Sequence, residues 1–199
     1  TDGSGVAAPA YKALRAAGID VCTTGDHVYK RADVLKCFER EPDRLLRPLN
    51  YPEGTPGLGA NVYPANRGSR RVMVLQVMGR LFMDPLDDPF TAIDRELDAC
   101  RLKRDADAIL VDFHGEATSE KIAMGWHLDG RFSAVVGSHT HVPTADARVF
   151  PQGTAHVTDT GMVGPRDSVL GVDKDIIVGR FRDGIPRRFE VAGGPVQFN

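Results

Sequence analysis

The chain has 199 residues, of which 42% are hydrophobic and 26% charged, values typical of a globular protein with one sizeable core. A formal net charge of −2 provides no basic surface, so nucleic acid is not expected as a partner. Without a long apolar run or a signal-peptide pattern, we predict a cytoplasmic protein that does not cross a membrane. Three widely spaced cysteines with no C-x-x-C pair argue against a disulfide framework and a thiolate zinc site.

The first half of the chain alternates helical and extended patterns. Helix formers fill residues 8–17 and stop at Gly18, which fits a helix C-cap. The almost continuously apolar run 71–78 is typical of a central strand. In chain order, we predict helices at 8–17, 32–40 and 91–101, strands at 19–23, 61–64 and 71–78, and a Pro/Gly-rich loop at 47–59.

The second half begins with the same alternation and then changes to short strands. Thr118 or Ser119 caps a predicted helix that runs to about residue 128. Strands are predicted at 106–113, 132–137, 147–150, 155–158, 176–181 and 187–191. Helices between strands early and hairpins late predict an α/β domain with mixed sheets.

Polar clusters follow three of the predicted strands. They are Gly25-Asp26-His27, Asp112-Phe113-His114 and Ser138-His139-Thr140-His141. In open α/β sheets ligands bind at the carboxyl ends of strands, so these clusters are expected to share one site. Two histidines at i and i+2 of an extended segment also point to the same side.

Imidazoles together with carboxylates are the ligands that Mn, Fe, Co and Zn prefer. Two such ions about 3.5–4 Å apart can activate water and neutralise a phosphoryl group, and a further histidine can protonate the leaving oxygen. The sequence has no P-loop, no G-x-S-x-G motif and no convincing cysteine nucleophile. Structural or surface roles are predicted for His127 and His156. For Glu116 and Lys121, at the helix start after His114, we predict a cap and surface ion-pair role, with lining of the site as the alternative.

Five longer motifs occur at residues 25–27, 45–57, 112–121, 137–142 and 158–165. Together they resemble the YmdB family of calcineurin-like metallophosphoesterases, and the resemblance covers essentially the whole chain. It implies a single domain over residues 1–199 with a four-layer α/β/β/α sandwich and mixed sheets. It also implies a binuclear centre of two divalent transition metal ions (Fe, Mn or Zn) and hydrolysis of phosphodiesters, with cyclic nucleotides as the substrate class.

The resemblance assigns roles by position. His114 and His139 correspond to ligands of one metal ion, His141 to a ligand of the other, and His27 to the proton donor. Asp26 stands where the family usually has a metal-binding asparagine, and the extra negative charge implies slower turnover or a different metal preference. No substrate-binding residue is assigned.

Two family motifs are absent from these 199 residues. They are an opening strand that ends in a Gly-Asp ligand and an Asn-Gly-Glu-Asn motif, and Thr1 aligns just after the second of them. Because the first five residues also do not read as a translation start, we expect an N-terminally truncated chain with a vacant strand position beside strand 71–78 or 19–23. Such a chain would hold one metal ion, or none tightly.

Three hypotheses remain open. The first is a metal-dependent phosphodiesterase with His27 as the proton donor, acting on a small-molecule phosphodiester or cyclic nucleotide. The second is a catalytically weakened regulatory or interaction protein on the same fold. The third is a mononuclear metallohydrolase that uses Asp26, His114 and His139 and does not depend on His141. Assembly into a homo-oligomer is left open by the sequence.

Overall fold

The computed structural model describes residues 5–198, and its centre is a six-stranded mixed sheet. The strand order is β3-β4-β5-β6-β8-β7, with β4, β5, β6 and β8 parallel to one another and the edge strands β3 and β7 antiparallel to their neighbours. The strands span Ala60–Ala65 (β3), Arg70–Met78 (β4), Ala108–His114 (β5), Ala134–Ser138 (β6), Arg148–Val149 (β7) and Ala155–Val157 (β8).

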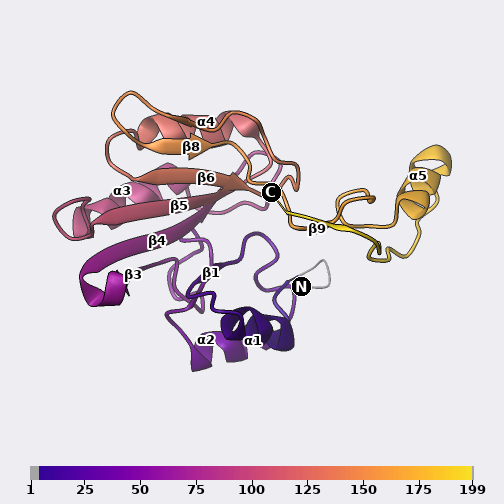
Figure 1. Cartoon of the computed structure of the whole chain (residues 1–199), viewed down its shortest axis with the longest axis horizontal. Helices are drawn as coiled ribbons and strands as arrows, with labels where there is room; N and C mark the ends of the chain where they lie inside the picture. The colour runs from indigo at the N-terminus through magenta and orange to yellow at the C-terminus, as the bar shows by residue number, and fades with distance from the viewer. Residues whose placement is uncertain (1–4, 199) are drawn as a thin grey trace.

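One face of this sheet carries the main hydrophobic core. In β5 every second residue is buried, so Ile109, Val111 and Phe113 face the core while Asp112 and His114 point to the opposite side. The core is closed by α3 (Pro89–Ala99) and α4 (Thr118–His127), which cover this face (Figure 1). Strand alternation therefore directs the polar side chains of β5 away from the core.

The opposite face meets a small second sheet. It consists of β1 (Cys22–Thr23) and β2 (Leu45–Leu46), which pair in parallel. On its outer side lie α1 (Ala8–Ala16) and α2 (Asp33–Arg40), packed around a second core that includes Tyr11, Val34 and Phe38 (Figure 1). The layers are therefore α3/α4, the large sheet, the small sheet and α1/α2, which is the predicted four-layer sandwich.

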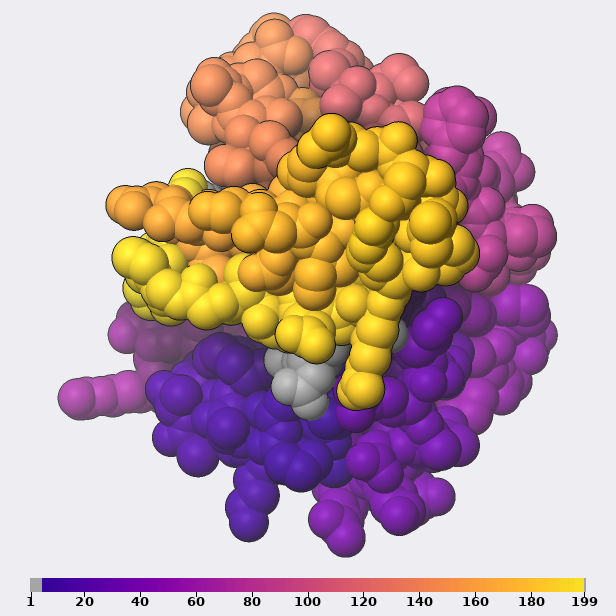
Figure 2. All heavy atoms as spheres, turned by 90° about the vertical axis from the view of Figure 1, so that its right-hand side faces the viewer, coloured from indigo at the N-terminus to yellow at the C-terminus, as the bar shows by residue number. Residues whose placement is uncertain are grey.

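The C-terminal segment forms an arm that stands away from the sandwich (Figure 1) and lies in front of it in Figure 2. It contains β9 (Gly164–Pro165), α5 (Lys174–Asp183) and β10 (Val196–Gln197), and β9 and β10 pair antiparallel. The strand prediction at 176–181 was wrong, because these residues belong to α5. Asp173 caps this helix through the N–H groups of Asp175 and Ile176, and Gly184, with a φ of 72°, ends it.

One further strand prediction was wrong, and one strand was missed. Of residues 187–191, only Val191 forms a β-bridge, to Val172, and β2 lies in a segment for which no strand was predicted. A short apolar run has no clear period, so tertiary contacts decide between helix, strand and loop.

The predicted vacant strand position can be checked against the pairing of β4 and β1. β4 pairs with β3 on one side and β5 on the other, so that position is filled. Within residues 5–198, β1 pairs only with β2. Residues 1–4 lie outside the described residues, and the truncation stays a prediction.

Composition raised two further expectations, about the cysteines and about a membrane span. All three cysteines are free thiols in residues 5–198, and burial raises the pKa of each. Cys37 lies in the core around α1 and α2 with Cys22 packed against it, and Cys100 lies in the main core. No helix in this part of the chain is both long and apolar enough to cross a membrane.

Candidate metal centre

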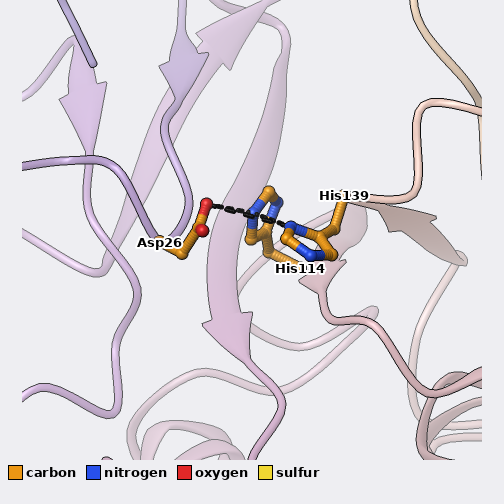
Figure 3. Close-up of side chains that lie close together, drawn as sticks. All are labelled: Asp26, His114 and His139. Carbon is orange, nitrogen blue, oxygen red and sulfur yellow. Dashed lines mark hydrogen bonds and ion pairs between the residues drawn. The ribbon is translucent and has the colours of Figure 1, made fainter. Parts of the chain in front are cut away.

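Three predicted site residues converge at the carboxyl ends of the strands, between the two sheets (Figure 3). Asp26 follows β1, His114 is the last residue of β5, and His139 follows β6. Asp26 Oδ1 lies 2.9 Å from His114 Nε2, and His114 Nε2 lies 3.1 Å from His139 Nδ1. The third side of this triangle, from Asp26 Oδ1 to His139 Nδ1, measures 3.8 Å.

The backbone around these side chains allows their close approach. Gly25 has a φ of 111°, and a Cβ at this position would lie 2.5 Å from the imidazole of His114. Only glycine therefore permits the turn that brings Asp26 to His114. His139 and His141 also have left-handed φ values, 106° and 67°, which are costly for residues with a side chain and must be held by surrounding contacts.

A hydrogen-bond chain behind His114 sets its orientation. The Ser138 hydroxyl donates to Asp112 Oδ1 over 2.5 Å, and His114 Nδ1 lies 3.0 Å from the same Ser138 oxygen. Because the single hydroxyl proton of Ser138 is given to Asp112, its oxygen accepts from His114 Nδ1–H. In neutral His114 this leaves the Nε2 lone pair directed at Asp26 and His139.

His139 is supported in the same way from its other side. Its Nε2 lies 3.2 Å from Glu116 Oε2, so the carboxylate accepts from Nε2–H and Nδ1 faces His114. Glu116 was predicted to act at the helix start and on the surface; it is half exposed, but its partner is a site histidine. Neither this contact nor the Ser138–Asp112 contact was predicted.

The donor set suits a transition metal ion. Ligands bound at about 2.1 Å with tetrahedral or octahedral angles lie about 3.0–3.4 Å apart, close to the 2.9, 3.1 and 3.8 Å found here. Burial opposes ionisation of Asp26, yet the hydrogen bond and charge of His114, with His27 and His139, lower its pKa to about 2. Burial, and then the charge of His114, lowers the pKa of His139. An anionic carboxylate and a neutral imidazole are the forms that bind metal.

The other two predicted site residues are less firmly held. His27 Nδ1 lies 3.0 Å from Asp26 Oδ2, and 49% of its side chain is exposed. His141 lines the same cavity as Asp26, His27 and His114 but is not part of the group of three. The structure thus brings three of the predicted residues together, pairs His27 with one of them and leaves His141 at the rim.

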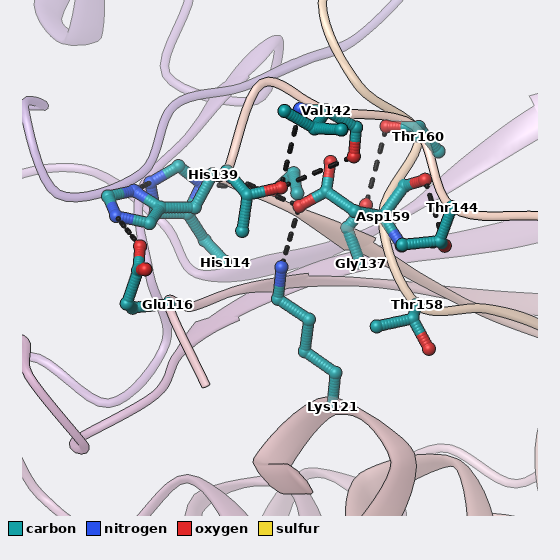
Figure 4. Close-up of polar contacts among 12 residues, drawn as sticks. His114, Glu116, Lys121, Gly137, His139, Val142, Thr144, Thr158, Asp159 and Thr160 are labelled. Carbon is teal, nitrogen blue, oxygen red and sulfur yellow. Dashed lines mark hydrogen bonds and ion pairs between the residues drawn. The ribbon is translucent and has the colours of Figure 1, made fainter. Parts of the chain in front are cut away.

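A buried ion pair supports the loop that carries His139 and His141 (Figure 4). Lys121, predicted to lie on the surface, is fully buried, and its Nζ lies 2.6 Å from Asp159 Oδ2. The same oxygen accepts from Thr140 N–H over 3.0 Å, between the two histidines. Gly137, in β6 just before this loop, also packs closely, because a Cβ there would collide with the backbone of Thr158.

The surface prediction for Lys121 was wrong because its partner is far away in the sequence. Thirty-eight positions separate it from Asp159, so helical periodicity could not reveal the pairing. The one available signal was that residues 158–165 belong to a motif shared with the family. Asp159 belongs to this motif and also accepts from Gly161 N–H.

Comparison with known proteins places the chain in a family. A family profile described as "YmdB-like protein" matches residues 1–199. The 2',3'-cyclic-nucleotide 2'-phosphodiesterase of Bacillus subtilis is 47% identical over 192 residues, which cover 96% of this chain and 71% of that protein.

Two solved structures share the fold at substantial identity. A hypothetical protein from Thermus thermophilus is 44% identical with a TM-score of 0.90, covering 98% of this chain and 75% of that one. A phosphatase from Mycoplasma pneumoniae is 33% identical with a TM-score of 0.85, covering 96% of this chain and 68% of the other. The predicted fold class is confirmed, and the Bacillus subtilis and Mycoplasma pneumoniae relatives carry the names of phosphate-ester hydrolases. The chain belongs to the YmdB-like family and has the four-layer metallophosphoesterase fold.

Proposed function

We propose that the chain is a metal-dependent phosphodiesterase that acts on small-molecule cyclic nucleotides. The observation that carries this proposal is the convergence of Asp26 Oδ1, His114 Nε2 and His139 Nδ1 within 3.8 Å of one another. Hydrogen bonds on the outer nitrogens of both imidazoles direct their inner lone pairs at this point, where a cation is needed. The substrate class rests on the name of the Bacillus subtilis relative.

In this proposal Asp26, His114 and His139 hold one divalent transition metal ion, Fe, Mn or Zn. A bound ion supplies Lewis-acid polarisation of the phosphate and lowers the pKa of a bound water. Asp26 also holds His27 through its second carboxylate oxygen, 3.0 Å from Nδ1. This contact orients the His27 ring and leaves Nε2 free to give a proton to the leaving oxygen, the role implied by the family resemblance.

A mononuclear metallohydrolase is the second candidate, and one observation favours it. Among residues 5–198, Asp26, His114 and His139 are the single group of three that could hold a metal ion. The predicted second ion would have His141 as its one assigned ligand. Removing His141 therefore distinguishes one ion from two.

The remaining predictions concern location and assembly. A cytoplasmic protein with a small-molecule substrate fits the proposal, and so does a homo-oligomer. The homo-oligomer is supported by the C-terminal arm, where Phe181, Phe189 and Phe198 expose apolar side chains. Sedimentation of the purified chain tests the assembly, and a monomer at all concentrations would contradict it.

The function is tested by hydrolysis of bis(p-nitrophenyl) phosphate and of 2',3'-cyclic AMP with Mn²⁺, Fe²⁺ or Zn²⁺. We expect hydrolysis that is lost in His27→Ala and His139→Ala and retained in His127→Ala, since His127 pairs with Asp94 outside the site. Retention in His141→Ala indicates the mononuclear enzyme. No hydrolysis with any of these metals would contradict an enzymatic role and favour the weakened interaction protein.

A further inference from the structure

The side chain of Gln76 occupies the junction between the two sheets. It lies in the middle of β4, in a run of apolar residues, and is fully buried. A buried amide in such a strand is costly unless all of its polar atoms find partners. In Gln76 both the amide oxygen and the amide nitrogen have partners, although no role was predicted for this residue from the sequence.

The partners of Gln76 come from both sheets. Its Oε1 accepts from Thr24 N–H over 3.0 Å and from Gly25 N–H over 3.1 Å, in the turn that presents Asp26. Its Nε2 donates to Asp112 Oδ2 over 2.8 Å. Two backbone N–H groups need an acceptor at the position of Oε1, so the amide cannot be flipped by 180° and its NH₂ group must face Asp112.

From Asp112 the chain of contacts continues to a candidate metal ligand. The other oxygen of Asp112 accepts the Ser138 hydroxyl proton, and the Ser138 oxygen therefore accepts from His114 Nδ1–H. The alternative position for the His114 proton is Nε2, which lies 2.9 Å from Asp26 Oδ1. By donating to Oδ2, Gln76 holds the Asp112 carboxylate with Oδ1 toward the Ser138 hydroxyl, and this places the Ser138 oxygen as an acceptor in front of His114 Nδ1.

We propose that Gln76 is a positioning residue that sets two parts of the metal centre at once. It anchors the turn that presents Asp26, and through Asp112 and Ser138 it keeps the Nε2 of His114 unprotonated and directed at Asp26 and His139. The consequence for metal binding rests on the proposed function. The tautomer of His114, in contrast, is a property of the metal-free protein and is tested without metal.

The first measurement is the tautomer. Long-range ¹H–¹⁵N spectra of the metal-free protein, at a pH where His114 is neutral, report which ring nitrogen carries the proton. We expect the Nδ1–H form in the wild type and a shift toward Nε2–H in Gln76→Met and in Ser138→Ala. Ser138→Thr, which restores a hydroxyl, should return the Nδ1–H form, and Gln152→Met, at an exposed glutamine, serves as the matched control.

The second measurement is Mn²⁺ affinity by calorimetry. Loss of an outer partner of a metal-binding histidine typically weakens metal binding about 10- to 100-fold, and we expect this loss in Gln76→Met and Ser138→Ala but not in Gln152→Met. Circular dichroism first shows whether each variant is folded. Should Gln76→Met fail to fold, Ser138→Ala, at a half-buried position, tests the same chain of contacts.

The outcomes separate the two proposals. A wild-type His114 in the Nε2–H form, or an unchanged tautomer and Mn²⁺ affinity in folded Gln76→Met and Ser138→Ala, would overturn the positioning role. A wild type and variants that show the expected tautomers, together with a wild type that binds no Mn²⁺, Fe²⁺ or Zn²⁺, would overturn the proposed function while supporting the role of Gln76.

Discussion

The inner and outer parts of the candidate site differ in how their side chains are supported. In the inner part, Asp26, His114 and His139 contact one another, and each also contacts a further side chain outside the group. Between 12% and 23% of each of the three side chains is exposed. In the outer part, His27 is 49% exposed and held from one side, and His141 lies at the rim. In this candidate site, the histidines whose ligand atoms converge are the ones held through both ring nitrogens, as expected for metal ligands.

The loop that carries His139 and His141 shows the same difference over three residues. Both have left-handed backbone angles, and the peptide between them is held by Asp159 through Thr140 N–H. Of the two histidines, only His139 points toward His114 and Asp26, and Glu116 contacts its other ring nitrogen. Both residues thus share an unusual backbone conformation, and side-chain contacts decide which one joins the inner part.

The largest expected effect comes from removing the buried support of this loop. Lys121→Met leaves the Asp159 carboxylate buried and unpaired, which should lower the free energy of unfolding by about 3–5 kcal/mol. Urea denaturation of the metal-free protein measures this loss. Lys12→Met, at an exposed position of α1, is the matched control.

The double variant Lys121→Met/Asp159→Asn removes both charges together. It should recover most of that stability, because the amide oxygen can still accept from Thr140 N–H. Finding Lys121→Met as stable as the wild type would show that the loop does not depend on the ion pair.

The second prediction sets the inner part directly against the outer part. His139→Ala removes one of three convergent ligand atoms and should weaken Mn²⁺ binding by more than about 100-fold, beyond the effect of losing an outer partner. His141→Ala should weaken it by less than about 10-fold. Equal losses in calorimetric titrations would contradict the division of the site into two unequal parts.

The third prediction concerns pH and the charge at the centre of the inner part. The pKa of Asp26 is lowered from 3.8 to about 2 in the folded protein, so its carboxylate stabilises the fold above pH 3.8. This contribution, roughly 2 kcal/mol at most, is lost as the pH falls from about 4 to about 2. Urea unfolding of the metal-free protein across this range should show a loss in Asp26→Asn that is smaller than that of the wild type by this amount, because other carboxylates with a lowered pKa, such as Asp146 and Asp159, still contribute.

The matched control for this prediction is Asp20→Asn, at an exposed aspartate. It should keep the pH dependence of the wild type. An identical dependence in Asp26→Asn would mean that the histidines around Asp26 do not stabilise its ionised form.

The smallest expected effect tests the contact behind His139. Glu116 is half exposed, so water screens its interaction with His139 Nε2. Glu116→Gln keeps an acceptor oxygen and should weaken Mn²⁺ binding by no more than about 10-fold, whereas Glu53→Gln, at an exposed loop position, should have no effect. A loss as large as that of His139→Ala would show that the carboxylate charge, rather than ring orientation, holds the ion.

Much of this fold could be predicted from local patterns. The helices α1 to α4 and the strands β4, β5 and β6 follow apolar periodicity and end close to their predicted residues. The convergence of Asp26, His114 and His139 followed from the rule that strand ends share one sheet edge. The α5 helix was mistaken for a strand because its apolar residues form a short run without a clear period and its cap, Asp173, was not recognised.

By itself the sequence determined the layered α/β class, the family and the three strand-end clusters, because periodicity and motifs are local properties of the chain. Only the tertiary structure decided which polar side chains act together. Gln76 meets Thr24 across 52 positions, and Lys121 meets Asp159 across 38. These contacts depend on how the two sheets are stacked and on which face of a helix is buried, and no pattern within one segment of the sequence contains that information.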